Sequence, residues 1–413
     1  MSARSRRIVI VGGCGHVGLP LGLVLADVGA RVWLLDIDKA KVGQINAGEM
    51  PFREDGAEPL LRRHVGKALT ATTDQECLRD AEVVITVVGT PVDRHLSPDM
   101  NEVYRAMDDV IGRMPEDSLL ILRSTVYPGI TKLIFERIQT LDRRILLAFC
   151  PERIAEGKAI EELRALPQLV SAFEPRAMAA AKELFLTIAP QAIELSPLEA
   201  ELAKLFSNSW RYLNFAISNQ FFLLAESYGL DFYRIYDAAT RDYPRMKSFA
   251  KPGFAAGPCL LKDTLHLGAF AQNNFFMGHA AMLINEGLPN FIVEKLRRSG
   301  DVRRRVAILG MAFKANSDDP RESLSYKLRN LLALEAKEVL CTDPYVKDAS
   351  LVPLETALEK AEVVILGAPH SVYRELEIPA DKLVVDIWGF WKHAVGNKLE
   401  IPLAAATPSL SQK

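Results

Sequence analysis

Residues 7–36 read RIVIVGGCGHVGLPLGLVLADVGARVWLLD. The apolar, β-branched start predicts a strand over residues 7–11, and the apolar run over residues 19–28 predicts a helix. Between them stands G-x-G-x-x-G at residues 13–18, and a second predicted strand follows over residues 30–35. This order is typical of a dinucleotide-binding α/β unit, because glycines permit a tight turn and let a pyrophosphate approach the start of a helix. The predicted cofactor-binding residues of this turn are Gly13, Gly15, His16, Val17 and Gly18.

Asp36 closes the second predicted strand. A carboxylate at this place accepts hydrogen bonds from the ribose hydroxyls of an adenosine and repels a 2′-phosphate. The sequence therefore predicts NAD rather than NADP as the cofactor, although Lys39 and Lys41 lie close enough to weaken the preference. A purely structural glycine turn is the alternative interpretation, and the combination of strand, helix and Asp36 argues against it.

The alternation of strands and helices continues with three apolar runs at residues 81–88, 118–122 and 145–149. Continuous apolar strands predict a parallel sheet covered on both faces, and ligands of such sheets bind at the carboxyl ends of the strands. The turns that follow the three runs are Gly89-Thr90-Pro91, Ser124-Thr125-Val126-Tyr127-Pro128-Gly129 and Pro151-Glu152-Arg153-Ile154-Ala155-Glu156-Gly157. Each of the two glutamates in the third turn, Glu152 and Glu156, also fits the alternative of an ordinary helix cap.

The middle of the chain is predicted to be helical. Residues 199–230 contain no glycine or proline before Gly229, and their apolar residues recur at helical spacing. Lys204 and Asn208 lie four positions apart and therefore share one face of this helix. A solvated lysine is the alternative for that pair taken alone. The helix holds more apolar residues than one buried stripe requires, which predicts a central buried helix or a subunit interface.

A second stretch, Pro252-Gly253-Phe254-Ala255-Ala256-Gly257-Pro258-Cys259-Leu260-Leu261-Lys262-Asp263, carries the candidate nucleophile. Small residues let the backbone approach a ligand, and Pro258 is expected to open a helix. Cys259 is then placed in a first helical turn, where free N–H groups favour a thiolate, and Asp263 follows one turn later. A thiol and a carboxylate at this spacing suit covalent catalysis followed by proton transfer. A buried structural cysteine and an ordinary helix aspartate are the alternative.

The last third of the chain repeats the pattern of the first. A strand over residues 304–313, a helix over residues 322–336 and a strand that reaches Asp343 predict a second nucleotide-binding type of fold. The sequence AEVVI at residues 81–85 recurs letter for letter at residues 361–365. The first turn of this part lacks G-x-G-x-x-G, which predicts a different ligand. Its candidate diphosphate-binding residues are Lys314 and Arg321.

Composition limits the classes of function. The chain has 413 residues, which predicts two or three domains, and its net charge of -2 argues against nucleic-acid or membrane partners held by bulk charge. The five cysteines include no CxxC pair, which predicts a reduced, cytoplasmic protein without a metal site. The amino terminus does not resemble a signal peptide, and no apolar run is long enough to span a membrane.

Several motifs together resemble those of the nucleotide-sugar 6-dehydrogenases, the UDP-glucose/GDP-mannose dehydrogenase family. The resemblance runs from about residue 7 to about residue 390. It implies two Rossmann-like domains, at residues 1–195 and 301–413, joined by a helical dimerisation segment at residues 196–300. It also implies NAD in the first domain, a nucleotide sugar as substrate, and a homodimer or higher homo-oligomer. The motifs are Ser124-Thr125-Val126 with Pro128-Gly129, Pro151-Glu152 to Gly157, Glu199-x-x-x-x-Lys204-x-x-x-Asn208, Cys259-x-x-Lys262-Asp263, and Phe313-Lys314 with Arg321-Glu322-Ser323.

The resemblance also implies roles for individual residues. Cys259 corresponds to the nucleophile, Lys204 and Asn208 to the groups that steady an oxyanion, and Asp263 to a residue that works with a water molecule. Catalytic assistance is implied for Glu152 and Thr125. Further cofactor contacts are implied at Lys41, Thr90, Pro91, Ser124, Glu156 and Arg321. Substrate contacts are implied at Arg153, Glu156, Lys204, Asn208, Arg245, Gly253, Phe254, Ala255, Gly257, Phe313 and Lys314. Arg245 resembles an arginine that reaches the substrate of the partner subunit, but its spacing to Gly253 differs.

Two departures from the glucose-type pattern stand out. Ala256-Gly257-Pro258 replaces Gly-Gly-Ser before the cysteine, and Asn219-Gln220 replaces an Asn-Glu pair in the central helix. The first departure lies in the loop expected over the sugar and therefore concerns sugar identity, whereas the second touches no predicted catalytic role. UDP-glucose is the predicted substrate, and UDP-N-acetylhexosamines and GDP-mannose remain open. The predicted reaction is a four-electron oxidation of the sugar C6 alcohol to the acid.

Two other classes of protein remain open. A two-electron hydroxyacid dehydrogenase has a Rossmann domain, a helical domain and a catalytic lysine, but it needs neither Cys259 nor residues 304–390. A non-enzymatic sensor of nucleotide sugars needs neither Lys204 nor Cys259. The number of NADH molecules formed per substrate distinguishes the two-electron dehydrogenase from the predicted four-electron enzyme. Any turnover at all excludes the non-enzymatic sensor.

Overall fold

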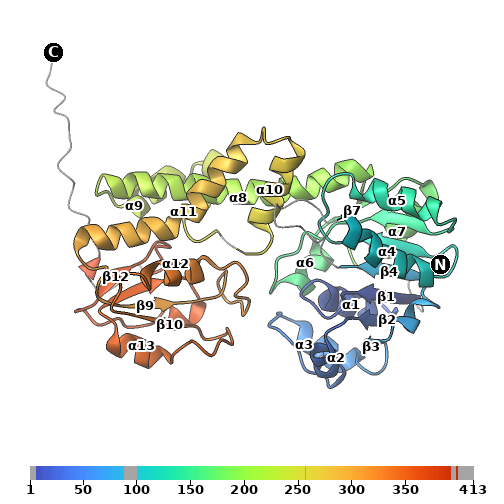
Figure 1. Cartoon of the computed structure of the whole chain (residues 1–413), viewed down its shortest axis with the longest axis horizontal. Helices are drawn as coiled ribbons and strands as arrows, with labels where there is room; N and C mark the ends of the chain where they lie inside the picture. The colour runs from blue at the N-terminus through green and yellow to red at the C-terminus, as the bar shows by residue number, and fades with distance from the viewer. Residues whose placement is uncertain (1–5, 88–99, 256, 392–396, 399–413) are drawn as a thin grey trace, which may run out of the picture. The chain divides into compact units, whose positions relative to one another are not determined.

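The structure is a computed structural model that describes residues 6–87, 100–255, 257–391 and 397–398 (Figure 1). The chain divides into two compact units. Unit 1 comprises residues 1–207 and 269–272, and unit 2 comprises residues 208–268 and 273–413. The predicted division into three domains is a finer one, and it stays a prediction.

Unit 1 is built on an eight-stranded sheet with the order β3-β2-β1-β4-β5-β6-β7-β8, in which only the β6–β7 pair is antiparallel. The strands are β1 (Arg7–Val11), β2 (Arg31–Leu35), β3 (Leu69–Thr72), β4 (Val83–Thr86), β5 (Leu119–Leu122), β6 (Leu146–Phe149), β7 (Gln168–Ala172) and β8 (Ala192–Leu195). The helices are α1 (Gly18–Asp27), α2 (Lys39–Asn46), α3 (Ala57–His64), α4 (Met100–Arg113), α5 (Ile130–Thr140), α6 (Ala159–Ala165) and α7 (Pro175–Phe185), with a 3-10 turn η1 (Gln75–Leu78).

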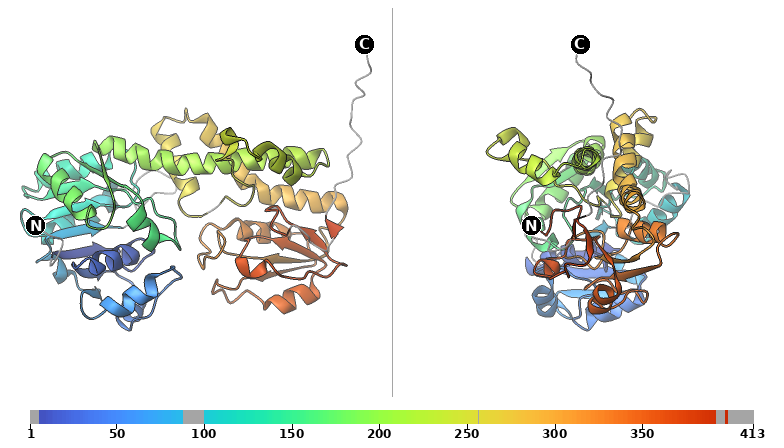
Figure 2. Two further views of the ribbon diagram at one scale, coloured as in Figure 1. Left: turned by 180° about the vertical axis from the view of Figure 1, so that it is seen from behind. Right: turned by 90° about the vertical axis from the view of Figure 1, so that its left-hand side faces the viewer.

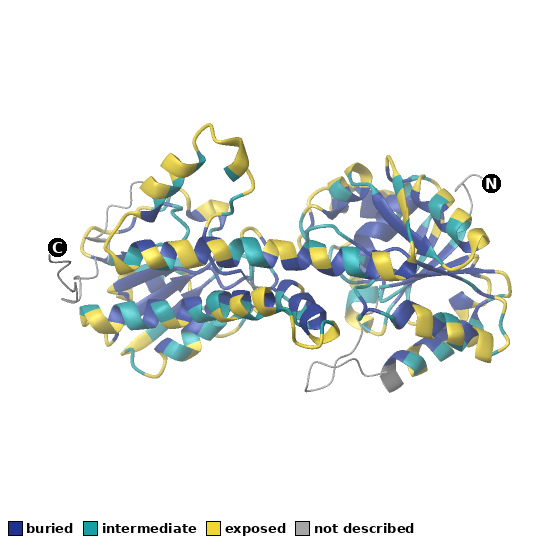
Figure 3. Ribbon diagram, turned by 90° about the horizontal axis from the view of Figure 1, so that it is seen from above, coloured by how far each residue is buried: buried dark blue, intermediate teal, exposed yellow. Residues whose placement is uncertain are grey.

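The central strands of this sheet are apolar on both faces. Ile8 and Ile10 of β1 belong to one buried core and Val9 to another, because successive side chains of a strand point to opposite faces. Helices α1, α3, α6 and α7 contribute to the first core, and α4 and α5 contribute to the second. Figure 3 shows the strands as buried beneath partly exposed helices. This arrangement confirms the predicted doubly wound α/β fold.

Unit 2 holds a parallel sheet with the order β10-β9-β11-β12-β13. Val306 and Ile308 of β9 belong to the core shared with α11 and α12, whereas Ala307 and Leu309 belong to the core on the other face. The strands are β9 (Arg305–Leu309), β10 (Glu338–Thr342), β11 (Val363–Leu366), β12 (Leu383–Val385) and β13 (Asn397–Lys398). The helices are α9 (Phe232–Thr240), α10 (Leu260–Phe270), α11 (Phe276–Ser299), α12 (Leu324–Leu332) and α13 (Leu354–Lys360), with 3-10 turns η2 (Pro244–Met246) and η3 (Ser371–Tyr373).

Helix α8 (Pro197–Ser227) runs without interruption through 31 residues, as Figure 2 shows from behind. The boundary between the units falls inside it, between Ser207 and Asn208. The structure thus confirms a long central helix, which begins two residues before the predicted range of 199–230 and ends three residues before its end.

The repeated AEVVI sequence makes the same hydrogen bond to a neighbouring strand in both sheets. The Glu82 carboxylate accepts a hydrogen bond from the backbone N of Arg7 at 3.2 Å, and the Glu362 carboxylate accepts one from the backbone N of Arg305 at 3.1 Å. Each glutamate thereby binds the first residue of the strand that comes first in the sequence of its sheet, β1 or β9. Equal sequence here reflects equal strand register in the two units.

Candidate active site

The glycine-rich turn after β1 is tight for steric reasons. A Cβ atom at Gly13 would lie 2.6 Å from the carbonyl oxygen of Ile10, and one at Gly18 would lie 2.6 Å from the Cα of Gly13. A Cβ at Gly15 would meet only the carbonyl oxygen of Gly12, at 3.8 Å. Packing within unit 1 therefore requires glycine at positions 13 and 18. The open space at Gly15 fits the close approach of a pyrophosphate.

Asp36 follows β2 and lies beside this turn. Its Oδ2 accepts a hydrogen bond from the backbone N of Cys14 at 2.9 Å, and its Oδ1 accepts one from the backbone N of Asp38 at 3.1 Å. Each carboxylate oxygen can accept a second bond, so two acceptor positions remain for ribose hydroxyls. Lys41 pairs with Asp38 at 3.8 Å.

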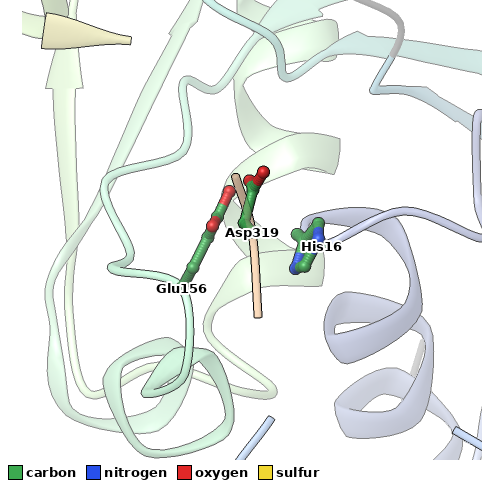
Figure 4. Close-up of side chains that lie close together, drawn as sticks. All are labelled: His16, Glu156 and Asp319. Atoms are coloured by element: carbon green, nitrogen blue, oxygen red, sulfur yellow. The ribbon is translucent and has the colours of Figure 1, made fainter. Parts of the chain in front are cut away.

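His16 and Glu156, two predicted cofactor contacts, lie close together in unit 1 (Figure 4). A ring nitrogen of His16 and a carboxylate oxygen of Glu156 are within 4.8 Å of each other. The His16 ring also packs on Phe52, with the ring centroids 4.0 Å apart. The turn after β1 and the loop after β6 therefore bring these side chains together. Thr90 and Pro91 fall outside the described residues.

A buried arginine organises the loops after β5 and β6. Arg123 is fully buried, and its guanidinium donates to Oε2 of Glu152, to Oε1 of Gln168 at 3.0 Å and to the carbonyl oxygen of Cys150 at 3.0 Å. Oε1 of Glu152 accepts bonds from the backbone N of Arg153 at 2.7 Å and of Ile154 at 3.0 Å. Both oxygens of this predicted catalytic carboxylate are therefore held in place by the protein.

The same arginine directly precedes Ser124 and Thr125, which are half-buried. Sequence reasoning missed Arg123 and Gln168. An arginine at the end of an otherwise apolar strand was the only signal, and nothing in the sequence linked it to Glu152.

Cys259 directly precedes α10. Its carbonyl oxygen accepts a hydrogen bond from the backbone N of Asp263 at 2.9 Å, which is the bond that closes the first turn of the helix. The predicted helix begins earlier, at Pro258, and that prediction is wrong by two residues. Cys259 is exposed, whereas the other four cysteines, Cys14, Cys77, Cys150 and Cys341, are buried. Burial raises the pKa of the Cys77 and Cys341 thiols to about 11. Exposure at a helix start therefore sets Cys259 apart from the other four cysteines, and its role as nucleophile stays a prediction.

Asp263 is buried in α10 beside Asn208 of α8. Its Oδ2 accepts a hydrogen bond from Nδ2 of Asn208 at 2.6 Å, and Nζ of Lys262 lies 3.6 Å from its Oδ1. Unit 2 thus brings together two of the predicted catalytic residues. Lys204 lies one turn before Asn208 in the same helix and is buried, 9% exposed.

Gly253 and Gly257, both predicted to contact substrate, are each packed closely against other side chains of unit 2. Asn219 donates from Nδ2 to the carbonyl oxygen of Gly253 at 3.0 Å and accepts at Oδ1 from the backbone N of Gly253 at 2.8 Å. A Cβ at Gly253 would lie 2.2 Å from the Trp388 ring, and one at Gly257 would lie 2.6 Å from the Phe313 ring. Asn219, which the sequence analysis gave no role, therefore fixes the loop before Cys259.

Phe254 and Ala255, in the same loop, are buried. The Gly257 end of the loop borders a pocket of about 430 Å³, which Glu286, Glu322 and Lys327 also line. Arg245 lies in η2, exposed, with its guanidinium 5.7 Å from the centroid of the Tyr243 ring.

In unit 2, Nε of Arg321 donates to both carboxylate oxygens of Asp319, at 3.0 and 2.9 Å. Asp319 is labelled in Figure 4. The backbone N of Phe313 donates to the carbonyl oxygen of Asp319 at 3.0 Å, so this pair shapes the loop that carries Phe313 and Lys314. Nζ of Lys314 lies 5.5 Å from the centroid of the Phe313 ring.

Asp343 follows β10 as Asp36 follows β2, but both oxygens of its carboxylate are hydrogen-bonded to neighbouring groups of unit 2. Oδ2 accepts from the backbone N of Met311 at 2.6 Å and of Ala312 at 3.0 Å, and Nε2 of His370 lies 3.0 Å away. Oδ1 accepts from the backbone N of Tyr345 at 2.8 Å and of Val346 at 3.0 Å. Burial opposes ionisation, yet these bonds together lower the pKa of Asp343 to about 2.

Comparison with known proteins assigns the chain to a family. Residues 6–189 match the NAD-binding domain of the UDP-glucose/GDP-mannose dehydrogenase family, residues 198–286 match its central domain, and residues 307–393 match its UDP-binding domain. The chain belongs to the UDP-glucose/GDP-mannose dehydrogenase family. It is therefore an NAD-dependent nucleotide-sugar dehydrogenase, and the predicted cofactor is confirmed as NAD.

Relatives within this family differ in their sugars. The chain is 29% identical over 382 residues to the UDP-N-acetyl-D-mannosamine dehydrogenase of Methanocaldococcus jannaschii, covering 90% of this chain and 87% of the relative. It is 26% identical over 411 residues to the NDP-N-acetyl-D-galactosaminuronic acid dehydrogenase of Ralstonia nicotianae, covering 93% and 96%.

Solved structures agree with this assignment. A UDP-N-acetylmannosamine dehydrogenase from Pyrococcus horikoshii matches with a TM-score of 0.86 at 26% identity, covering 96% of this chain and 100% of that one. A UDP-glucose dehydrogenase from Pyrobaculum islandicum matches with a TM-score of 0.86 at 27% identity, covering 96% and 98%. Among the described residues, no helix has both the length and the apolar character needed to cross a membrane.

Proposed function

We propose that this chain oxidises the C6 alcohol of a UDP-N-acetylhexosamine to the carboxylic acid. The reaction type rests above all on one observation: Cys259 is exposed at the start of α10, one turn before the buried Asp263–Asn208 pair. The choice of sugar is supported by the relatives, which include dehydrogenases of UDP-N-acetyl-D-mannosamine and of an N-acetylgalactosamine derivative. They favour this substrate class over UDP-glucose, the substrate that the sequence analysis placed first.

The chemistry needs a nucleophile because the reaction removes four electrons from one carbon. The first oxidation takes a proton from the C6 hydroxyl and a hydride from C6, which leaves an aldehyde. The Cys259 sulfur then adds to the aldehyde carbon and forms a tetrahedral thiohemiacetal, which again carries a hydride that can leave. Loss of this second hydride leaves a thioester. Each oxidation needs its own hydride acceptor, so two NAD molecules, bound one after the other, would supply them.

Hydrolysis of the thioester completes the reaction. A water molecule adds to the carbonyl carbon, the C–S bond breaks, and the sulfur leaves as the thiolate while the carboxylate forms. Asp263 is the proposed partner of this water, because its buried carboxylate is already oriented by Asn208 at 2.6 Å. Such a fixed carboxylate can accept the proton that water loses.

Lys204 and Asn208 are the proposed stabilisers of the tetrahedral oxyanions. The Asn208 amide nitrogen carries two hydrogens, and the bond to Asp263 uses one of them, so the second remains for an oxyanion. Loss of one such donor typically costs about 3–4 kcal/mol of barrier. Glu152 and Thr125 are proposed to assist from the loops of unit 1, where Arg123 fixes the position of the Glu152 carboxylate.

A panel of nucleotide sugars tests this proposal. UDP-N-acetylmannosamine, UDP-N-acetylglucosamine, UDP-N-acetylgalactosamine, UDP-glucose and GDP-mannose are each offered in limiting amount with excess NAD, and NADH absorbance is followed to completion. We expect two NADH per sugar and an acid product, with the highest kcat/KM for a UDP-N-acetylhexosamine. One NADH per sugar would point to a two-electron dehydrogenase instead. A preference for UDP-glucose would refute the substrate assignment while leaving the reaction type intact.

Assembly as a dimer is part of the proposal. Helix α8 exposes six large apolar side chains: Leu198 (46%), Phe206 (55%), Trp210 (58%), Ile217 (41%), Phe221 (49%) and Leu224 (54%). Exposure of so many large apolar groups on one element is typical of a surface that associates with another copy.

A further inference from the structure

The loop between β5 and α5, residues 124–129, carries Thr125 and is held at both ends by buried ionisable side chains. Arg123 holds the start through its bonds to Glu152, Gln168 and the Cys150 carbonyl. Glu201, a residue of α8, holds the other end. All of these residues belong to unit 1. The sequence analysis gave Glu201 no role.

Glu201 is 1% exposed, and both of its carboxylate oxygens accept hydrogen bonds from the start of α5. Oε2 accepts from the backbone N of Gly129 at 2.7 Å. Oε1 accepts from the backbone N of Thr131 at 2.9 Å and from its Oγ1 at 2.6 Å. Gly129 has a φ of 100° and no side chain with which to cap the helix. Glu201 therefore supplies the cap from a position 72 residues further along the chain.

This solution is a costly way to cap a helix. Burial raises the pKa of Glu201, against the three hydrogen bonds that favour its charged form. A local cap such as serine or aspartate would avoid burying a carboxylate from another helix, but L side chains rarely adopt the φ of 100° found at position 129. A local cap would not, however, join α5 to α8. The distinguishing consequence of Glu201 is thus a fixed distance between these two elements.

The loop before α5 and helix α8 both carry residues to which the proposed function gives a catalytic part. Glu201 lies three positions before Lys204 on α8, so the two buried side chains share one helix face. Gly129 lies four positions after Thr125 in the loop that Glu201 holds. We propose that Glu201 is a positioning residue that sets the Thr125 loop against the Lys204 turn of α8. This inference rests on the proposed function for its catalytic consequence.

The first test compares the kinetics of Glu201→Gln with those of Glu136→Gln, which removes an exposed glutamate from α5. Glutamine has one acceptor oxygen, so its amide NH₂ must face either Gly129 or Thr131, whose N–H groups also donate. Small displacements of reacting groups cost up to about 100-fold in rate. We expect kcat of Glu201→Gln to fall by about 10- to 100-fold, while KM for NAD changes by less than about 3-fold. Glu136→Gln should match the wild type.

A second pair of variants works even if Glu201→Gln folds poorly. Thr131→Ser keeps the hydroxyl that donates to Glu201, and Thr131→Val keeps the shape but removes the donor. We expect Thr131→Ser to retain kcat and Thr131→Val to lose part of it at similar Tm. Equal kcat for these two variants, or an unchanged kcat in folded Glu201→Gln, overturns the inference.

Amide hydrogen exchange separates failure of this inference from failure of the proposed function, because it needs no sugar. Faster exchange over residues 124–131 in Glu201→Gln than in the wild type supports the anchor, and unchanged exchange refutes it. If the wild type oxidises no sugar of the panel, the proposed function fails, and exchange alone then decides whether Glu201 holds the loop.

Discussion

Cys259 is the residue on which the proposed chemistry depends most. We expect Cys259→Ala to lose acid formation by about 1,000-fold or more while still binding NAD, because the other four cysteines are buried and are not placed to replace it as nucleophile. Cys259→Ser should stall as an ester, since an alkoxide is a poorer leaving group than a thiolate, and intact-mass spectrometry would detect the adduct. Cys77→Ala, which changes a buried cysteine, is the matched control. Undiminished acid formation by Cys259→Ala would refute the mechanism.

Asp343 makes acid stability depend on one buried carboxylate. Its pKa in the folded state is lowered from 3.8 to about 2, so it stabilises the fold above its unfolded pKa, and this contribution is lost as pH falls from about 4 to 2. The shift corresponds to about 2 kcal/mol at neutral pH. We expect Asp343→Asn to be destabilised at pH 7 and to differ less from the wild type near pH 2. Denaturant titrations at the two pH values measure this, and an equal deficit at both would contradict it.

At the residue scale, the sequence predicted the types of residue better than their contacts. Gly13, Gly18 and Asp36 follow from spacing, because a fixed turn needs those residues at those intervals. The bonds from Arg123 to Glu152 and from Glu201 to Gly129 join residues 29 and 72 positions apart. Such pairs depend on strand order and helix packing, which a single sequence does not reveal.

Among the elements, the loop before Cys259 is held most directly by α8. We expect Asn219→Ala to lower the free energy of unfolding by about 2–5 kcal/mol, because the N–H and C=O of Gly253 and Oδ1 of Asn285 lose their partner. KM for the sugar should also rise, since residues 253–257 lose their anchor. Asn214→Ala, at an exposed position of the same helix, is the control. A normal KM in a folded Asn219→Ala would show that this anchor does not matter for the substrate.

Strands and helices were predictable where one periodicity dominated. The run at residues 7–11 and the long α8 follow directly from apolar patterning. The start of α10 did not, because Pro258 is compatible with the first turn of a helix but also with the turn that precedes one. In this chain Pro258 and Cys259 lie in the turn that precedes α10.

For the whole molecule, the exposed apolar face of α8 predicts association. We expect light scattering of the wild type at micromolar concentration to give twice the chain mass of 45.8 kDa. Trp210→Glu should shift the mass toward the monomer, because burying a charge in an apolar interface is costly. Leu334→Glu, at another exposed apolar position outside α8, should leave the mass unchanged. A fully active wild-type monomer would contradict the proposed dimer.

Asp36 and Asp343 differ in their capacity to accept hydrogen bonds from a bound nucleotide. Both residues end the second strand of a Rossmann-like sheet, yet only Asp36 keeps spare acceptor positions. An adenosine ribose at the corresponding place in unit 2 would meet a carboxylate that already has five hydrogen-bonding partners. A dinucleotide that is held through its ribose at Asp36 could not be held in the same way at Asp343.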